Sequence, residues 1–436
     1  MAGDNKSVTR SNDTSALGRF LSRVATIEPH ELTAVVAAFL LFFFMWAGYF
    51  AVRPVRETIA TIIGRDQTAD LWIVTSLASI LIIPIYGSIV ARFRRSVFLP
   101  AMYAIVAIVL AFTGFALSGE NIDPLAGKFF YVFISVVNLF LLSVFWSFLL
   151  ELFDTGQSKR LFGVIAAGGS AGALAGPFLS FLFVEKIGNS GVLFLGGALF
   201  VAAIICQRAL LNIWHQRAGE GARAEERPLG GNIFAGITLL VKSPYVLGIA
   251  LFVVFISTVN TILYFEQLRL VEVNYPEITD RTRIFAGVDW IVQTLTVISQ
   301  IFLTGRIAKR FGVIALVTAV PLVMAGGFVL LAATGTLAIL MVVVIGRRAM
   351  EYAFVRPGRE MLWSPLDKET KYKAKSTVDV PVYRGADAIA AQVNKAVEAA
   401  GVGPAAIAMM GAGIALVWAA VGWWLGRRCE DLSKTK

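Results

Sequence analysis

The chain has 436 residues, of which 57% are hydrophobic and only 16% charged, with a mean hydropathy of +0.73 and a formal net charge of +10. A soluble globular domain seldom has this composition, so the sequence predicts an all-α membrane protein with many spans. The positive charge does not indicate nucleic acid, because cytoplasmic loops of membrane proteins collect Lys and Arg. Two cysteines and two histidines are too few for a metal cluster, and we expect neither a metal nor a cofactor.

Apolar runs long enough to cross a bilayer recur along the whole chain, and they predict twelve transmembrane helices. The first six lie at about 31–58, 70–91, 97–118, 128–152, 161–185 and 191–212. The second six lie at about 244–266, 283–304, 312–333, 336–364, 376–399 and 404–426. The run at 376–399 is the most polar, so we expect it to turn its polar face toward the protein interior.

The distribution of Lys and Arg predicts how these helices are oriented. With the N-terminus in the cytoplasm, the inner segments hold 25 of these residues and the outer loops hold six. The positive-inside rule therefore favours an inner-membrane protein with both termini in the cytoplasm. We expect a cytoplasmic N-terminal segment, a first six-helix half, a cytoplasmic linker with a surface helix, a second six-helix half and a cytoplasmic tail. These units have the boundaries 1–30, 31–212, 213–243, 244–427 and 428–436.

The two halves resemble each other in sequence. The stretch YGSIVARFRRS (86–96) follows the second run, and TGRIAKRFGVI (304–314) follows the eighth. The fourth and tenth runs share the pair Trp-Ser. Two related six-helix halves joined by a central cytoplasmic loop are the layout of the major facilitator superfamily, which the sequence therefore resembles. This resemblance implies transport by rocking of the two halves around a central site.

A motif R-P-x-R-E occurs twice, in YFAVRPVRETI from Tyr49 and in YAFVRPGREML from Tyr352. In each copy the two arginines are three residues apart and share a helix face. The copies consist of Arg53, Arg56 and Glu57 in the first run and Arg356, Arg359 and Glu360 in the tenth. Guanidinium groups bind phosphate and carboxylate in a planar, bidentate geometry, so two such pairs are typical of a path for an anion.

Further ionisable residues lie inside the predicted spans, where each costs roughly 2.5–3.5 kcal/mol unless it has a partner, water or a ligand. One interpretation is structural: basic and acidic side chains pair and hold the bundle together. The other is functional: the arginines hold an anionic solute and the acids pair with them while the site is empty. A basic stretch at 368–375 would raise the local concentration of anions at the cytoplasmic mouth. It also fits the positive-inside rule alone.

Two features of the apolar runs are expected to be structural. Gly168, Gly172 and Gly176 are spaced by four residues and predict a face on which another helix packs closely. Most Phe and Trp side chains are expected to face lipid or to lie at the membrane interfaces.

Three stretches resemble the ATP/ADP translocase-type nucleotide transporters. They are YFAVRPVRETIA, FWSFLLELFDTGQSKRLFG and REMLWSPLDKETKYKAKSTVDVPVYRGAD, and the last is the most specific. The resemblance implies exchange of one nucleoside phosphate for another without hydrolysis. It also implies binding roles for Arg53, Arg56, Lys373, Lys375, Asp379 and Arg384. The sequence departs from the family at Glu57, where Asp is common, and at Asp387, which stands where the family has a Gly- and Lys-rich run.

The candidate site combines both lines of reasoning. The candidate substrate-binding residues are Arg53, Arg56, Arg356, Arg359, Lys373, Lys375 and Arg384. The candidate coupling or pairing residues are Glu57, Glu151, Glu266, Asp289, Glu360, Asp379 and Asp387. The expected partners are the lipid bilayer and a small anionic solute such as ATP or ADP, and a monomer fits the sequence as well as an oligomer does.

Three functions follow from these residues. The first is a secondary transporter that exchanges nucleotides. The second is a proton-coupled symporter of another organic anion, such as a sugar phosphate or a cell-wall fragment. The third is a membrane scaffold or sensor that transports nothing. The sequence contains no nucleophile with its base and no nucleotide-hydrolysing loop, so we do not expect an enzyme.

Overall fold

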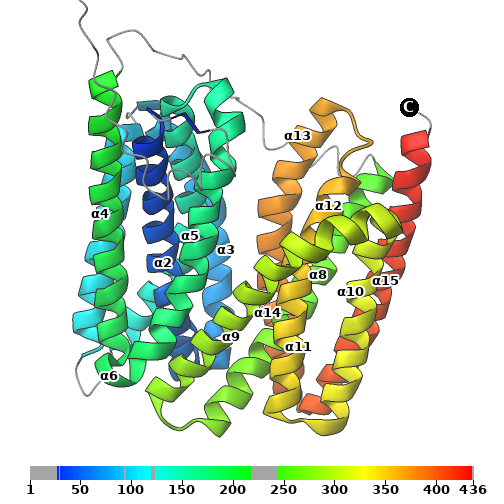
Figure 1. Ribbon diagram of the computed structural model, residues 1–436. Helices are drawn as coiled ribbons and strands as arrows, with labels where there is room; N and C mark the ends of the chain where they lie inside the picture. The colour runs from blue at the N-terminus through cyan, green and yellow to red at the C-terminus, as the bar shows by residue number, and fades with distance from the viewer. Residues whose placement is uncertain (1–26, 29, 93–94, 119–122, 218–242, 435–436) are drawn as a thin grey trace, which may run out of the picture.

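The computed structural model describes residues 27–434 except 29, 93–94, 119–122 and 218–242. Over these residues the chain is helical and has no strand, as predicted. The predicted surface helix and most of the linker lie outside the described residues. Figure 1 shows two groups of helices, α2 to α6 on one side and α8 to α15 on the other.

The first group contains five long helices. They are α2 (Leu32–Ile63), α3 (Arg65–Arg92), α4 (Arg95–Ala116), α5 (Pro124–Leu152) and α6 (Thr155–Arg217). The last of these is broken at Gly188, whose φ of 66° lies in the left-handed region that favours glycine. Its two segments match the predicted runs at 161–185 and 191–212.

Several helices of the second group are interrupted. The regular ones are α8 (Pro244–Asn274) and α15 (Pro404–Lys434), whereas α10 (Gly305–Thr334) is broken at Gly312. Three others continue through a short π-helical turn. They are α9 (Ile278–Ser299) into η1 (Gln300–Thr304), α11 (Leu337–Met350) through η2 (Glu351–Val355) into α12 (Arg356–Leu362), and α13 (Lys368–Thr377) through η3 (Val378–Val382) into α14 (Tyr383–Ala399).

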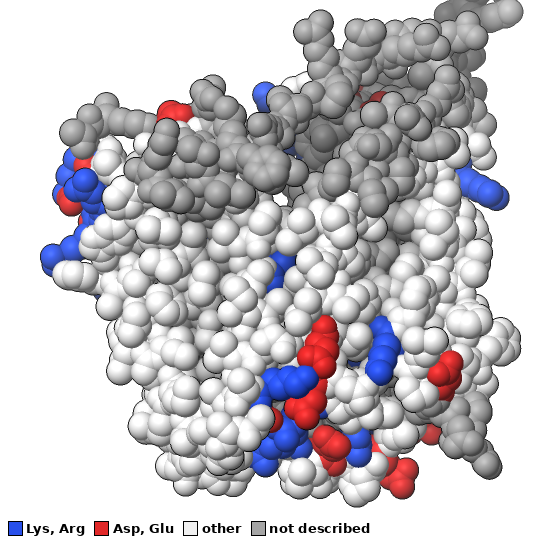
Figure 2. Space-filling view, turned by 180° about the vertical axis from the view of Figure 1, so that it is seen from behind, with Lys and Arg blue, Asp and Glu red and all other residues white. Residues whose placement is uncertain are grey.

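Helices occupy all the predicted apolar runs. Eight of the described helices are long and apolar enough to cross a membrane, and α6 is one of these although it spans two predicted runs. The count of twelve crossings stays a prediction. Figure 2 shows a broad middle zone with few charged side chains, whereas Lys, Arg, Asp and Glu gather toward the lower end of that face. This distribution suits a protein whose middle lies in hydrocarbon.

Each group of helices has its own hydrophobic core, and a third cluster joins the two. Phe145 and Phe148 are fully buried in the first core, and Phe252 and Phe328 are fully buried in the second. The third cluster brings α2, α3 and α5 against α8, α9 and α14. Its buried members are Ala60, Ala69, Tyr131, Phe265, Leu268, Val271, Phe285 and Ala391. The two halves are therefore packed together at one end, near the last turn of α2.

The predicted close-packing face on α6 is confirmed. A Cβ atom at Gly172 would lie 2.2 Å from the Phe43 carbonyl oxygen of α2, and one at Gly176 would lie 2.5 Å from the Ala47 carbonyl oxygen. At Gly168 the nearest atom would be the Phe39 carbonyl oxygen at 2.4 Å. The two backbones thus approach so closely that a side chain does not fit between them.

We expect Gly172→Ala to destabilise the protein by about 1–3 kcal/mol, because the added methyl group forces α2 away from α6. The measurement is the unfolding temperature of purified protein in detergent. Gly163→Ala is the matched control in the same helix, since a Cβ atom there meets nothing within 4 Å. Equal unfolding temperatures for the two variants would contradict the packing argument.

Candidate functional site

A cavity of about 910 Å³ lies between the two halves. Its walls come from α2, α3, α5 and α6 of the first half and from α8, α9, α11, α12, α14 and the three π-helical turns of the second half. Among the residues whose side chains are described, six arginines line it, with four carboxylates among them. They are Arg53, Arg56, Arg347, Arg356, Arg359 and Arg384, with Glu57, Glu351, Asp379 and Asp387. If all are ionised, the wall has a formal excess of two positive charges.

Polar contacts close the cavity at the end where the third hydrophobic cluster joins the halves. The Thr58 and Thr282 hydroxyl oxygens are 2.6 Å apart. Lys395 Nζ lies 2.8 Å from an Asp70 carboxylate oxygen, and Arg65 forms an ion pair of 2.7 Å with Glu398. The helices converge at this end, which the charge distribution predicts to be external, and diverge toward the end that carries α13 (Figure 1). The backbones of the two groups of helices are therefore farther apart at the predicted cytoplasmic end.

The first R-P-x-R-E copy lies in the last part of α2 and faces the cavity. Glu57 accepts a hydrogen bond from Arg56 and lies 3.9 Å from Arg53 Nε. Its other carboxylate oxygen accepts a hydrogen bond of 2.9 Å from the Tyr264 hydroxyl group of the opposite half. Arg56 also stacks over the Tyr131 ring at 5.3 Å. Burial of this cluster is tolerated because opposite charges and hydroxyl groups satisfy one another.

A second charged cluster links the halves beside the main cavity. Asp289 on α9 is 2.6 Å from Arg348 Nη1 and 3.4 Å from Arg53 Nη1. The side chains of Asp289 and Arg348 are only 5% and 10% exposed, so both charges depend on this contact. Arg53 thus stands between Glu57 of its own helix and Asp289 of the other half.

The second R-P-x-R-E copy follows the π-helical turn η2. Arg356 lies over the Tyr352 ring at 4.3 Å, and its Nε atom is 3.6 Å from Glu351. Its side chain is 53% exposed. Those of the other five arginines that line the described cavity are each 20% exposed or less. Arg359 is 3.2 Å from Asp379 on η3. Both arginines line the cavity, each with one carboxylate beside it.

The third basic group lies on α14. Arg384 Nη1 is 3.7 Å from Asp387, which accepts a hydrogen bond of 2.5 Å from the Ser257 hydroxyl group of α8. The Arg384 carbonyl oxygen accepts a hydrogen bond from Ser76 of the first half at 2.8 Å. The contact positions the start of α14 against α3.

Eight of the fourteen candidate residues line the cavity. They are Arg53, Arg56, Glu57, Arg356, Arg359, Asp379, Arg384 and Asp387. Asp289 lines a smaller adjoining cavity of about 80 Å³. The side chain of Lys373 lies outside the described residues, and Glu151 is exposed on α5 away from the cavity lining.

Three candidate residues form other contacts than expected. Glu360 pairs at 2.5 Å with Lys375, so the second motif does not keep its glutamate next to its arginines. Glu266 pairs at 2.5 Å with Arg269, one turn further along α8. Neither carboxylate lines the cavity, and neither does Lys375. Each of these two acids therefore pairs with a nearby cation outside the cavity and not with a cavity arginine.

Arg347, Arg348 and Glu351 are site residues that sequence reasoning did not select. Arg347 is 2.7 Å from Glu351 and donates a hydrogen bond to Asn260 of α8. All three lie inside the tenth apolar run. Charged residues inside a membrane span usually have a functional role, so their position alone could have identified them as site residues.

The stretch around 154–163 has a structural contact outside the cavity. Arg160 and Gln157 donate hydrogen bonds of 2.8 and 3.1 Å to the buried carboxylate of Glu31, which precedes α2. This contact fixes the beginning of α6 to the beginning of α2.

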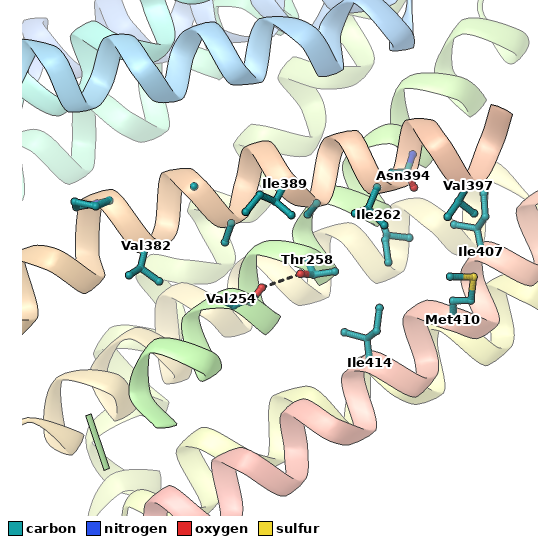
Figure 3. Close-up of a pocket in the computed structure, with 15 residues that line it drawn as sticks. Val254, Thr258, Ile262, Val382, Ile389, Asn394, Val397, Ile407, Met410 and Ile414 are labelled. Atoms are coloured by element: carbon teal, nitrogen blue, oxygen red, sulfur yellow. Dashed lines mark hydrogen bonds between the residues drawn. The ribbon is translucent and has the colours of Figure 1, made fainter. Parts of the chain in front are cut away.

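A separate cavity of about 400 Å³ lies between α8, α14 and α15 (Figure 3). Aliphatic side chains such as Val254, Ile389 and Ile414 line it, and no charged residue does. Thr258, which is labelled in the figure, uses its hydroxyl group to bond the Val254 carbonyl oxygen at 2.9 Å. This cavity suits an apolar group and does not suit an anion.

The family model of the Major Facilitator Superfamily matches residues 38–354, and the chain belongs to this superfamily of membrane transporters. ADP,ATP carrier protein 1 of Chlamydia trachomatis is 23% identical, with 84% of this chain and 82% of that protein aligned. ADP,ATP carrier protein 1 of Chlamydia pneumoniae is 22% identical, with 84% and 85% aligned. These similarities support the resemblance that the three sequence stretches indicate.

Solved structures agree on the fold. The nucleoside transporter NupG gives a TM-score of 0.64 at 14% identity, covering 91% of this chain and 99% of that one. A bacterial homologue of the iron transporter ferroportin, in an inward-facing state, gives 0.62 at 14% identity, covering 89% and 99%. At this level of identity the likeness extends to the fold alone.

We expect Asp289→Leu to destabilise the protein by about 3–5 kcal/mol, because it leaves Arg348 buried without its carboxylate. Arg348→Met is expected to cost less, since Asp289 keeps Arg53. The double variant should be more stable than the sum of the two losses predicts. Unfolding temperatures in detergent measure all three.

The control is Arg283→Gln, which breaks a surface pair with Glu185 in which both side chains are at least 40% exposed. Such a pair is worth about 0–1 kcal/mol. Additive losses for Asp289→Leu and Arg348→Met would show that the two residues do not depend on each other.

Proposed function

We propose that the protein is a secondary transporter that moves an anionic, phosphorylated solute by alternating access, and that it exchanges one nucleotide for another. One observation carries the proposal: six arginines from both halves line a single cavity that is closed at one end. Arginine is the side chain best suited to bind phosphate oxygens in pairs. The similarity to proteins named ADP,ATP carrier supports a nucleotide over other phosphorylated solutes.

The carboxylates in the cavity have a defined part in this proposal. Glu57, Glu351, Asp379 and Asp387 each lie within 4 Å of an arginine. A phosphate group that enters would take over these arginine contacts. The formal excess of two positive charges favours the exchange of a carboxylate for a more highly charged anion.

The contacts that cross between the halves support exchange over one-way transport. Opening of the closed end must separate Arg53 from Asp289 and Glu57 from Tyr264. Each separation removes one partner from a buried charge: Arg53 keeps only the longer contact to Glu57, and Glu57 loses a hydroxyl group but keeps Arg56. Loss of a partner by a buried charge is unfavourable. A bound anion supplies a replacement partner for Arg53, so the loaded protein reorients more easily than the empty one.

Proton-coupled symport of another organic anion is the second candidate. Asp387 favours it, because this buried acid has its nearest cation at 3.7 Å and a hydroxyl group at 2.5 Å. An acid with such weak charge compensation can gain and lose a proton during a transport cycle.

We expect proteoliposomes that contain ADP to take up labelled ATP at least tenfold faster than empty ones. Arg356→Ala should lower this uptake at least tenfold, because it removes the most accessible guanidinium group. Arg427→Ala is the control, since this arginine lies over Trp423 on α15 and not in the cavity. Equal uptake into loaded and empty vesicles would refute exchange, and normal uptake in Arg356→Ala would refute the binding role of this arginine. Absence of uptake by the unaltered protein would favour the scaffold.

A pH gradient separates exchange from symport. With an exchanger, uptake into ADP-loaded vesicles should change less than twofold when an inward proton gradient is imposed. With a symporter, the gradient should drive uptake into empty vesicles, and Asp387→Asn should abolish that stimulation. The measurement is initial uptake rate at fixed external pH.

A further inference from the structure

The two walls of the cavity differ in chemistry. On the first half, the charged lining residues are confined to one turn of α2, Arg53 to Glu57. The rest of that wall, from α2, α3, α5 and α6, is uncharged. Its α2 part consists of Phe42, Trp46, Tyr49 and Phe50. The second half carries the other seven charged lining residues, which are spread over α11, α12, α14 and the turns η2 and η3.

Trp46 is one of three partly exposed aromatic side chains on this wall, with Phe50 and Trp72. Trp72 packs against Tyr264 and Phe265 of the second half, and Phe42 and Tyr49 are almost fully buried. The Trp46 ring is supported by Phe50 at 5.3 Å, by Tyr49 at 5.6 Å and by Phe42 at 6.3 Å between ring centroids. The indole is therefore held in one orientation while part of it faces the cavity.

The part of this wall that α6 contributes is built from small residues. These residues recur on one helix face. They are Ala166, Gly169, Ser170 and Ala173. Phe42 already fills the position that a side chain at Gly169 would take, since a Cβ atom there would lie 2.4 Å from the Phe42 ring. The wall is thus a flat apolar surface next to an aromatic ring.

Arg356 lies on the opposite wall of the same cavity. Trp46 lines it from α2 of the first half, and Arg356 lines it from the start of α12 in the second half. Tyr49 and Tyr352 line it as well, each about one helical turn from Trp46 and Arg356 respectively. A partly exposed indole and the most exposed cavity arginine therefore belong to opposite walls of one volume.

From this arrangement we propose that the transported anion has two unlike ends: a flat aromatic ring that stacks on Trp46, and phosphate groups that Arg356, Arg359 and Arg384 hold on the opposite wall. This assignment rests on the function proposed above and makes Trp46 a specificity-determining residue. It favours nucleotides and disfavours anions without a ring, such as sugar phosphates and dicarboxylates. Stacking on an aromatic side chain accepts any base, so the ring type is selected weakly.

The test is a series of four probes on the purified full-length protein: ADP, adenosine, ribose 5-phosphate and pyrophosphate. Binding is measured by calorimetry, and competition with labelled ATP uptake is measured in ADP-loaded vesicles. For the unaltered protein we expect ADP to bind at least tenfold more tightly than each of the other three. This part of the test needs no variant.

Trp46→Ala should weaken ADP binding about tenfold, the scale of one lost stacking contact, and leave pyrophosphate binding within twofold. Trp46→Phe should restore most of the ADP affinity. Arg356→Ala should weaken ADP and pyrophosphate alike and leave adenosine unchanged. Trp423→Ala, on the outer surface of α15, is the matched tryptophan control and should change no affinity.

Two results would overturn the assignment while leaving anion transport intact. One is equal affinity of the unaltered protein for ADP and pyrophosphate. The other is an equal loss of both ligands in Trp46→Ala and in Trp46→Phe, with unfolding temperatures unchanged. If none of the three anions binds or competes, the proposed transport function itself fails, so the two failures are distinguishable.

Discussion

Arginine–carboxylate contacts between helices that lie in a membrane are the constraint on which this structure depends. A single charge at that depth is costly, and a pair is tolerated only when its partners are close and well oriented. The described helices meet this requirement by placing each buried carboxylate within 4 Å of an arginine, as with Glu57, Asp289 and Glu351. The pairs fix where the two halves touch, and they also determine which contacts must break when the halves move.

The same contacts explain why the cavity is more than a gap between two bundles. Arg53 belongs to the first half and has a carboxylate from each half beside it, Glu57 and Asp289. Arg356 has open volume beside it and only one long contact to Glu351. The arginines of the cavity therefore differ in exposure: the Arg53 side chain is 20% exposed and has two carboxylates beside it, whereas that of Arg356 is 53% exposed and has one.

Much of the fold could be predicted from the sequence, because long apolar runs and their breaks depend on local composition. The four arginines of the repeated R-P-x-R-E motif all line the cavity. The ion-pair partner of Glu360 could not be predicted, because its contact with Lys375 depends on how α13 lies relative to α12. The aromatic wall was missed for a different reason. Trp46 and Phe50 were expected to face lipid or the membrane interfaces, and no local pattern distinguishes a ring that faces lipid from one that faces a cavity.

The π-helical turns in the second half have a consequence for how this protein can vary. Each such turn holds one residue more than the α-helical turn that it replaces. Loss of one residue inside η2 or η3 would let the helix return to regular winding, and the arginines on both sides would keep their direction. Loss of one residue inside α2 would rotate everything beyond it by about 100°. The basic wall can therefore lose a single residue at η2 or η3 and keep its arginines in place, whereas the same loss in α2 would turn part of the aromatic wall away from the cavity.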